Sequence, residues 1–375
     1  MPRWMIALSL ALFCASPSLA EERVGEFSIP KVHPLARHQV ERLRELAHND
    51  PEAKALAQAV REAAQPLLDI EPAPLKVIHY EGLVNTDPRR IATVKQLRQM
   101  GDAARLMRFW QVSDDPRAAA ALQRLILAWT QTYELTGNDV NENKFYPLLV
   151  AYHALRDQFD SPNQQRLDDW VERLGRLHKQ AVENSTHFTN RYSKHVRLLA
   201  ICGMILKRDA WIEAAHEGIK RFVTQSLYAD GSSHDLKRRD TLTYHASALR
   251  PPIELAMLAG EQGRELYHWT SPQGGAIKKS VDFVVPYALG EKVHLEWVNS
   301  QIDLDRRRAE AGIDYYQPGR PFDPQSALRL MEEASYFDAS LMRVVHHLTD
   351  SSAQRFPTWQ TLVNQAARAE GVRSP

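Results

Sequence analysis

An aspartate or serine followed by proline recurs along this sequence, each time just ahead of a run with helical apolar spacing. The dipeptide occurs as Asp50-Pro51, Asp115-Pro116 and Asp323-Pro324, with Ser161-Pro162 as a variant. The side chain of Asp or Ser can accept hydrogen bonds from the first free amides of a helix, and proline suits the first helical position. The recurring dipeptide therefore predicts the starts of several helices.

The residues after Asp115-Pro116 show the helical spacing clearly, with apolar side chains at Leu122, Leu125, Ile126 and Trp129. Residues at i, i+3, i+4 and i+7 lie on one face of an α-helix, so this run predicts an amphipathic helix. By the same pattern, further helices are expected near residues 33–48, 90–110, 141–158, 190–206, 209–227, 241–261 and 354–369.

Patterns typical of β-strands are scarce in this sequence. The clearest alternation of apolar and polar residues is at residues 76–80, and residues 281–285 fit either a strand or a helix. About a dozen amphipathic helices with short loops predict an all-α protein, in which consecutive antiparallel pairs form a bundle, a solenoid or a closed toroid. The absence of a strict sequence repeat argues against tetratricopeptide and ankyrin arrays.

Residues 1–20 have the pattern of a secretory signal peptide, with a basic start, an apolar run over residues 5–15 and the small-residue cleavage site Ser18-Leu19-Ala20. The apolar run is shorter than the roughly 20 residues of a membrane span, and no later apolar segment is long enough. We therefore expect a periplasmic or secreted protein. Residues 21–375 are expected to form a single domain, with a loop-rich part after Gly263.

Charge and cysteine content exclude some classes of protein. The sequence has 47 basic and 46 acidic residues, and one basic residue belongs to the signal peptide, so the mature chain is neutral. This argues against nucleic-acid binding through overall charge, although a local basic cleft can still bind an anion. Cys202 is the single cysteine of the mature chain and cannot form an internal disulfide, so a buried, inert thiol is expected.

Sequence motifs of several large enzyme classes are missing. The sequence contains no phosphate-binding loop, no G-x-G-x-x-G, no H-E-x-x-H, no G-x-S-x-G and no Cys/His set with zinc spacing. These absences disfavour nucleotide enzymes, zinc hydrolases and serine esterases, and no metal or other cofactor is expected.

Three polar segments interrupt the helical pattern, at residues 136–147, 189–195 and 234–245. Each stands near the start of an expected helix, so its side chains can project from one rim of a helical barrel. Helix N-termini also favour anions.

The second and third polar segments carry the residue types that are needed to break a uronate polymer. The C5 proton of a uronate is hard to remove until its carboxylate is neutralised by Asn, Arg, Lys or a protonated acid. A base must then take this proton, and an acid must protonate the departing O4, which Tyr or His can do. Asn, cations, Tyr and His all occur in the two segments.

The order of these residues resembles that of the alginate lyase superfamily, whose bacterial members are α/α-toroid polysaccharide lyases. Asn190 and His195 precede a stretch, residues 235–245, that looks like the family's Glu-Leu-Lys-Arg…Ala-Tyr-His stretch. Asn141-Glu142-x-Lys144 and residues 274–287 are similar to other superfamily segments. The similarity covers roughly residues 50–310 and contains several motifs in the right order.

The resemblance implies an all-α toroid, built as an incomplete barrel of antiparallel helix pairs, and a set of catalytic roles. Tyr244 would act as base and acid, and Asn190 with Arg238 or Arg239 would neutralise the substrate carboxylate. His195 would assist. The residues expected to bind the substrate are Arg238, Lys194, Arg191, His245, Asn141, Glu142 and Lys144.

The assisting residue is an open choice at this stage. In alginate lyases proper a histidine directly follows the asparagine, whereas Arg191 stands at that position here. Lys194, four residues after Asn190, would share its helix face. His195 is offset from that face by about 100°.

The resemblance implies β-elimination on an acidic polysaccharide such as alginate, polyglucuronate or a similar polymer, by a protein that we expect to be a monomer. A glycoside hydrolase on a similar toroid would need two carboxylates about 5–9.5 Å apart. Glu142, Asp235 and Asp240 are the acids in the motifs, and they form no obvious pair. The other alternative is a non-catalytic periplasmic protein that binds or assembles polysaccharide.

Overall fold

The computed structural model of the protein describes residues 29–261 and 263–368. The predicted signal peptide, residues 1–20, lies outside the described residues. Within the described ranges, no helix has both the length and the apolar character that crossing a membrane requires.

The described chain is almost entirely helical, which confirms the predicted all-α class. The α-helices are α1 (Arg37–Asn49), α2 (Pro51–Ala64), α3 (Pro88–Ser113), α4 (Pro116–Thr132), α5 (Asp139–Glu142), α6 (Tyr146–Leu155), α7 (Ser161–Asn184), α8 (Asn190–Ile205), α9 (Asp209–Ser226), α10 (His234–Arg239), α11 (Leu242–Glu261), α12 (Ile277–Ala288), α13 (Asp303–Glu310), α14 (Leu328–Ala334), α15 (Met342–Thr349) and α16 (Trp359–Ala367). The 3-10 helices are η1 (Gln65–Leu67), η2 (Asn143–Phe145), η3 (Arg156–Gln158), η4 (Asp314–Tyr316), η5 (Pro324–Ala327) and η6 (Ala339–Leu341).

The aspartate-proline dipeptides start helices as predicted. Asp50 Oδ1 accepts hydrogen bonds from two amides in the first turn of α2, and the side chain of Asp115 accepts one from the amide of Arg117 in α4. At α7 the cap is Asp160, so Ser161 is already the first helical residue. Asp323 starts the short 3-10 helix η5.

One expected strand is wrong, and one segment that fitted either a strand or a helix is a helix. Residues 76–80 are irregular, because their backbone bonds to loops and side chains, for example Lys76 O with the amide of Glu134 at 3.1 Å. Residues 281–285 lie inside α12. The sheet in the described chain pairs β1 (Leu295–Glu296) antiparallel with β2 (Arg320–Pro321).

The part of the chain after Gly263, expected to be loop-rich, contains five α-helices, α12 to α16, together with longer connections. One helix expected at residues 141–158 is divided into the end of α5, η2, α6 and η3. Pro147 accounts for this division, since it has no amide hydrogen to continue the helical hydrogen bonds.

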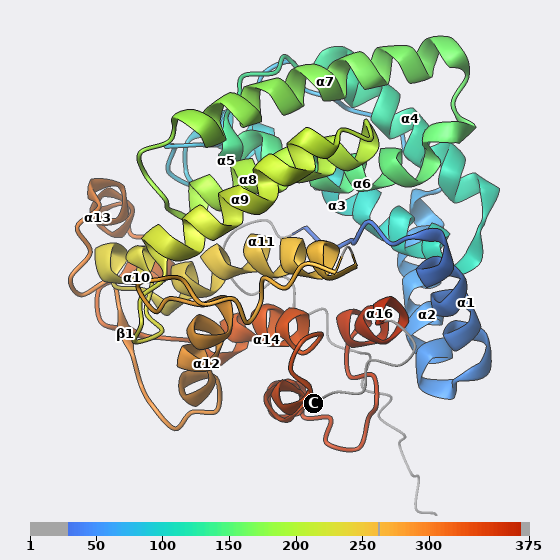
Figure 1. The fold of residues 1–375 in the computed structure, drawn as a ribbon. Helices are drawn as coiled ribbons and strands as arrows, with labels where there is room; N and C mark the ends of the chain where they lie inside the picture. The colour runs from blue at the N-terminus through green and yellow to red at the C-terminus, as the bar shows by residue number, and fades with distance from the viewer. Residues whose placement is uncertain (1–28, 262, 369–375) are drawn as a thin grey trace, which may run out of the picture.

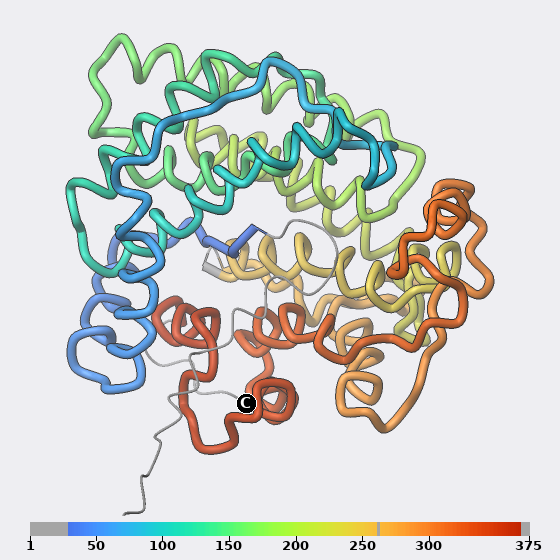
Figure 2. Tube along the Cα trace, turned by 180° about the vertical axis from the view of Figure 1, so that it is seen from behind, coloured from blue at the N-terminus to red at the C-terminus, as the bar shows by residue number. Residues whose placement is uncertain are grey.

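The helices form a ring of antiparallel pairs, as Figures 1 and 2 show from opposite sides. The longer helices α3, α4, α7, α8, α9 and α11 make up one half of this toroid. Helix α16 packs beside α1, where the first and last described helices meet. Gln39 Nε2 of α1 donates to Ala367 O of α16 at 3.1 Å. The fold is thus the helical toroid that the resemblance implied.

Residues 29–36, the segment before α1, cross the middle of the ring between α3 and α11 (Figure 1). Lys31 in this segment is buried and pairs with Glu254 of α11 at 2.5 Å and with Glu333 of α14 at 3.3 Å. Arg197 of α8 also contacts Glu254, at 3.2 Å. This ionic cluster ties the segment to three helices of the ring.

Candidate active site

The starts of α8 and α11, with α5 and α10, lie toward the same side of the molecule (Figure 1). The amide of Asn190, the first residue of α8, donates to Asp235 Oδ2 of α10 at 2.7 Å. Burial raises the pKa of Asp235 to about 6, although this hydrogen bond and the charges of Arg239 and Lys194 oppose the rise. Asp235 therefore connects the start of α8 to the helix that carries Arg239.

A tight turn between α10 and α11 places Arg239 against Tyr244. The hydroxyl of Ser233 caps α10 by accepting a hydrogen bond from the amide of Leu236 at 3.2 Å. The helix ends at Asp240, which has a left-handed φ of 52°. The guanidinium carbon of Arg239 then lies 3.7 Å from the centre of the Tyr244 ring, a distance at which a cation is attracted to an aromatic face.

Arg239 is also held by an acidic partner. Its guanidinium pairs with Asp305 of α13, with Nε 3.1 Å from Oδ2, and its side chain is 15% exposed. Burial lowers the pKa of Arg239, but the interactions with Tyr244 and Asp305 outweigh burial and raise it. The structure thus holds a fixed positive charge over the face of Tyr244.

Trp297 is a further neighbour of the Tyr244 ring. The two rings meet edge to face, with centroids 5.6 Å apart and an interplanar angle of 82°. Trp297 is buried and has a positive φ of 67°, and its amide donates to Asp240 O at 2.7 Å. The turn after α10 therefore fixes both of these neighbours of Tyr244.

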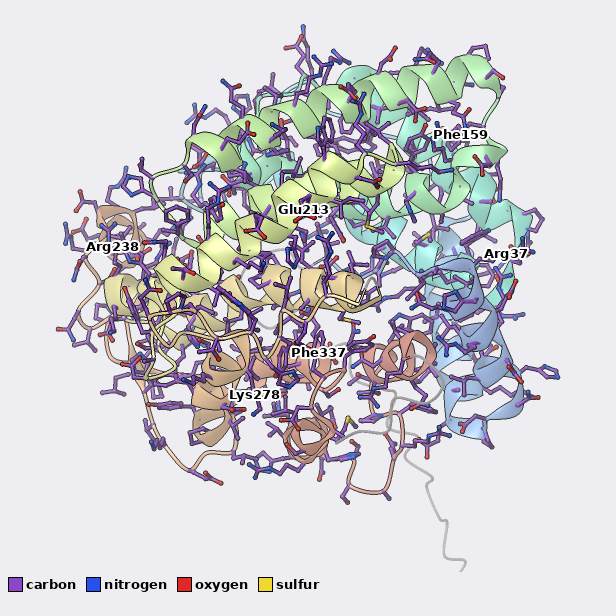
Figure 3. The ribbon with its side chains drawn as sticks, in the orientation of Figure 1. Arg37, Phe159, Glu213, Arg238, Lys278 and Phe337 are labelled. Carbon is purple, nitrogen blue, oxygen red and sulfur yellow. The ribbon has the colours of Figure 1, made fainter. Side chains whose placement is uncertain are left out.

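Arg238 and Arg239, which the sequence could not distinguish, face in different directions. Arg238 is exposed, and Figure 3 shows it at the outer edge of the molecule. Its carbonyl accepts a hydrogen bond from the amide of Gln301 at 2.9 Å. Of the two arginines, Arg239 is the one that lies against Tyr244.

His245, predicted as a substrate-binding residue, is fully buried. Its Nδ1 lies 2.8 Å from Ser233 Oγ and its Nε2 lies 3.0 Å from Ser280 O. Both ring nitrogens are thus engaged inside the protein, because the residue after Tyr244 on α11 is turned toward the core. In this structure His245 links the cap of α10 to α12.

Arg191 and His195 group around another acid, Asp139 of α5. Arg191 Nε donates to Asp139 Oδ1 at 2.8 Å, and its Nη1 pairs with Glu81 at 2.5 Å. His195 Nε2 lies 3.7 Å from the same Asp139 oxygen. The predicted residues of α8 therefore fall into two groups. Asn190 bonds to α10, whereas Arg191 and His195 face α5.

The Asn-Glu-x-Lys motif has a mainly structural position. Asn141 is buried, and its Nδ2 donates to Ile78 O at 3.2 Å. Glu142 is fully buried, which removes it from direct contact with a polymer. The ammonium group of Lys144 lies 4.4 Å from the centre of the Tyr80 ring and is only partly exposed.

The sequence analysis did not predict three residues that contact the predicted ones: Asp139, His178 and Asp305. Asp139 stands in the first polar segment and could have been included on that ground. His178 lies among the apolar positions of α7, where a histidine looks like a core residue. Asp305 lies 66 residues from Arg239, and no local pattern joins them.

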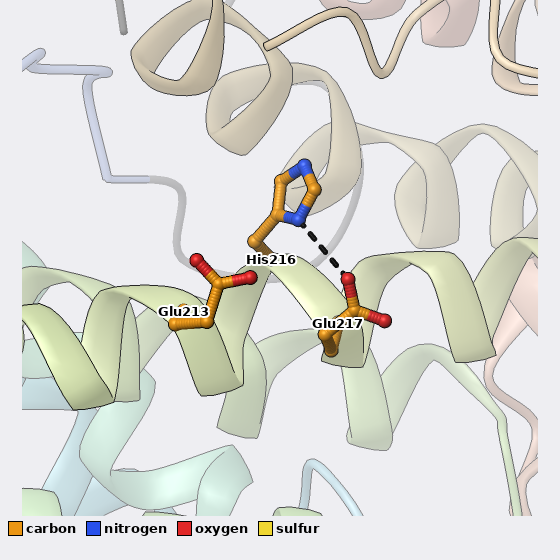
Figure 4. A group of neighbouring side chains, drawn as sticks. All are labelled: Glu213, His216 and Glu217. Carbon is orange, nitrogen blue, oxygen red and sulfur yellow. Dashed lines mark ion pairs between the residues drawn. The ribbon is translucent and has the colours of Figure 1, made fainter.

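A separate group that could hold a metal ion by geometry is formed by Glu213, His216 and Glu217 on α9 (Figure 4). Arg264 pairs with Glu213, and Lys220 pairs with Glu217 at 3.0 Å. Because Arg264 and Lys220 already pair with the carboxylates of Glu213 and Glu217, we do not assign a metal ion to this group.

The family model for alginate lyase matches residues 40–294, about two thirds of the chain. The chain belongs to the alginate lyase family. A polysaccharide lyase from Stenotrophomonas maltophilia (strain K279a) is 26% identical over 190 residues, which are 47% of this chain and 57% of that protein. The match thus spans somewhat more than half the length of this curated relative.

Solved structures of alginate lyases share the fold of this family member. An alginate lyase from Bacteroides ovatus superposes with a TM-score of 0.62 at 13% identity, covering 90% of this chain and 99% of that chain. Alginate lyase A1-III from Sphingomonas species A1 gives a TM-score of 0.50 at 17% identity, and the match covers 79% of this chain and 97% of that chain. A variant of A1-III complexed with a tetrasaccharide also gives a TM-score of 0.50, at 16% identity. This match covers 78% of this chain and 94% of that chain.

Proposed function

We propose that this protein is a polysaccharide lyase that cleaves an acidic, uronate-containing polysaccharide by β-elimination. The observation that carries the proposal is the fixed Arg239 cation over the ring of Tyr244, joined through Asp235 to the start of α8 at Asn190. Membership of the alginate lyase family supports the same reaction class.

In the proposed reaction, Tyr244 moves the protons. Its oxygen takes the proton from C5 as the electron pair of that C–H bond forms the C4–C5 double bond. The bond from C4 to O4 breaks, and O4 receives a proton as it leaves. Tyrosine can act as such a base and acid, and the contact with Arg239 holds the Tyr244 ring in place for this role.

Asn190 and Arg239 neutralise the substrate carboxylate in this proposal. Negative charge moves onto the carboxylate as the C5 proton leaves, and fixed donors that face this charge stabilise the transition state. Lys194 is close enough for its charge to act on Asp235, so it belongs to the same group. Exposed Arg238 is assigned to binding the polymer next to the cleaved bond.

His195 assists in the proposed site as a neutral imidazole. Burial lowers its pKa to about 4, with His178 and Arg191 acting in the same direction and Asp139 opposing. Near neutral pH this ring is therefore uncharged, so one nitrogen is free of a proton and can accept a hydrogen bond. Arg191 occupies the position after Asn190, where its ion pairs with Asp139 and Glu81 anchor the start of α8.

We assign the substrate class as a polyuronate, with alginate and polyglucuronate as the first polymers to test. The tetrasaccharide complex of A1-III shows that a member of this fold binds an oligosaccharide. We also propose, from the sequence, that the protein is exported to the periplasm or secreted and acts as a monomer.

The acids near Tyr244 favour a lyase over a glycoside hydrolase. Asp305 pairs with Arg239, and Glu296 accepts hydrogen bonds from Thr241 Oγ1 at 2.8 Å and from the Thr243 amide at 3.0 Å. Since each carboxylate is committed to a protein group, neither is poised as the acid or nucleophile of a hydrolase.

The test follows ultraviolet absorbance of the unsaturated uronate, with the purified mature protein against alginate blocks, polyglucuronate and glycosaminoglycans. We expect a rise on at least one polyuronate and its loss in Tyr244→Phe. The matched control is Tyr228→Phe, because Lys237 covers the Tyr228 ring at 3.9 Å in a comparable way. Sugar binding without any rise in the wild-type protein would instead favour a non-catalytic binding protein.

A further inference from the structure

Three side chains make a line of contacts from α5 through α7 to α8. Glu142 Oε2 lies 2.9 Å from His178 Nε2, at ion-pair distance although bent away from hydrogen-bond geometry. His178 Nδ1 lies 2.7 Å from His195 Nδ1. Glu142 and His178 are fully buried, whereas the side chain of His195 is 15% exposed. The line therefore begins in the core and ends at the partly exposed histidine of the proposed site.

The turn before α5 fixes the orientation of the Glu142 carboxylate. Its Oε1 accepts hydrogen bonds from the amides of Thr136 at 2.6 Å and Gly137 at 3.0 Å. Gly137 has a positive φ of 75°, which glycine adopts without strain and which this turn requires. Because Oε1 is held by the backbone, Oε2 is the oxygen that faces His178.

This arrangement selects one tautomer of each histidine. A carboxylate next to Nε2 of His178 favours a proton on that nitrogen, which leaves Nδ1 as an acceptor. His195 must then donate from its own Nδ1, because two bare nitrogens 2.7 Å apart would repel. A neutral His195 therefore carries its lone pair on Nε2.

The charged groups around His195 are compatible with this tautomer. Asp139 of α5 favours a proton on Nε2, but its Oδ1 is 3.7 Å away and already accepts from Arg191 at 2.6 and 2.8 Å. The Glu142–His178 contact is shorter and lies in the core, where the attraction between charges is screened less. The titratable groups that face His195 are thus Asp139 and Glu142 from α5, His178 from α7 and Arg191 from α8.

We propose that Glu142 and His178 are positioning residues that hold His195 as the tautomer with a bare Nε2, which can accept a hydrogen bond in the site. The role in catalysis rests on the proposed lyase function, whereas the tautomer itself does not. In this proposal Glu142, which was predicted from the sequence to bind substrate, instead orients His195 through His178.

The decisive variant is Glu142→Gln, which keeps the shape of the side chain. Its amide oxygen replaces Oε1 at the two backbone donors, so its NH₂ group points at His178 Nε2. This donor reverses the hydrogen-bond order, and His195 then carries its proton on Nε2. We expect ¹⁵N NMR of the histidine rings to show a bare His195 Nε2 in the wild type and a protonated one in the variant.

The activity readout tests whether the tautomer matters for the reaction. We expect kcat of Glu142→Gln on the polyuronate to fall about 10- to 100-fold with KM changed less than about 3-fold, because a wrong tautomer removes the acceptor while leaving the binding groups. The control is Glu172→Gln on α7, whose carboxylate pairs with Arg176 and Arg208 instead. It should leave both the His195 spectrum and kcat unchanged.

The outcomes separate the two proposals. A protonated Nε2 on His195 in the wild type would overturn the inference, and this measurement does not need the variant to fold. A reversed tautomer with unchanged kcat would also overturn the catalytic role. The expected spectra together with no lyase activity in the wild type would count against the proposed function and leave the positioning of His195 standing.

Discussion

At the scale of single residues, Tyr244 is fixed by two neighbours. Arg239 covers one face of the ring at 3.7 Å, and Trp297 meets the ring at 5.6 Å. Asp305 pairs with the guanidinium of Arg239, whose side chain is 15% exposed. In the proposed reaction, this fixed position would let Arg239 act on both Tyr244 and a bound carboxylate without first being ordered, which would lower the cost of reaching the transition state.

Replacing Arg239 by lysine should impair the reaction even though the charge is kept. A lysine ammonium lacks the planar fork that covers a ring and pairs with a carboxylate at the same time. We expect Arg239→Lys to lower kcat by roughly 10- to 100-fold, a loss of about 1.4 to 2.7 kcal/mol. Steady-state kinetics on the active polymer measures this change. The matched variant Arg238→Lys should stay within about 3-fold of wild type, and equal losses in both variants would contradict the assignment.

His245 should make the stability of the fold dependent on pH. Burial lowers its pKa to about 4, from an ordinary value of 6.5. The unfolded chain then binds more protons than the folded protein across this window, so the His245 contribution is complete above pH 6.5 and is lost as pH falls toward 4.

The measurement compares the free energy of unfolding in urea for the wild type and His245→Asn. The wild type should be the more stable protein near neutral pH. This advantage should shrink by about 2 kcal/mol between about pH 7 and about pH 5, since the variant has no imidazole to protonate. An advantage that stays constant with pH would show that His245 is not buried in its neutral form.

Sequence reasoning pointed to the segment around Tyr244 but could not predict which way each of its side chains faces. Adjacent helical residues point about 100° apart, so Tyr244 faces the site while His245 faces the core. The same applies to Arg238 and Arg239. Asp305 and His178 were not predictable, because they come from distant parts of the chain and join the site through packing.

At the scale of elements, α10 decides where Arg239 lies. This six-residue helix depends on its cap, because Ser233 Oγ accepts from Leu236 N and also contacts His245 Nδ1. A helix this short has little stability of its own. The position of Arg239 therefore depends on the capping residue as well as on Asp305.

Replacing Ser233 by alanine should affect both stability and activity. We expect Ser233→Ala to lower the free energy of unfolding by about 1 to 2 kcal/mol, because it removes a cap and one partner of a buried ring nitrogen. The lyase rate should fall as well, because α10 carries Arg239. Ser233→Thr keeps the hydroxyl and should restore most of both. Thermal unfolding and kinetics measure the effects, and a full rate in Ser233→Ala would refute the dependence on α10.

Most helices were predictable because their signals are local. Asp50 and Asp115 cap α2 and α4 as expected, and α11 forms where expected even though it contains Pro251 and Pro252. The irregular residues 76–80 were mispredicted as a strand, since an alternating pattern does not reveal whether another strand is present to pair with it.

At the scale of the whole molecule, the segment before α1 helps hold the ring together. Glu254 is buried, which raises its pKa, but Lys31 and Arg197 outweigh burial and lower the pKa to about 2. Lys31 is thus a partner that the buried acids of α11 and α14 require.

Removing Lys31 should destabilise the entire fold. Lys31→Ala leaves Glu254 and Glu333 short of a cation in the core, and breaking such a buried pair costs about 3 to 5 kcal/mol. The control is Lys76→Ala, whose pair with Glu134 is exposed and should contribute less than about 1 kcal/mol. Urea unfolding of both variants gives the comparison. Similar losses in the two would show that the central cluster does not hold the ring.

The most direct test of the proposed function is the chemistry of the product, read by mass spectrometry after digestion of a polyuronate in water enriched in heavy oxygen. β-Elimination predicts oligosaccharides with an unsaturated terminal uronate, one water lighter than hydrolysis products and without heavy oxygen from the cleavage step. Products that are saturated and carry heavy oxygen at the new reducing end would show hydrolysis and contradict the assignment of Tyr244, Arg239 and Asn190 to a lyase.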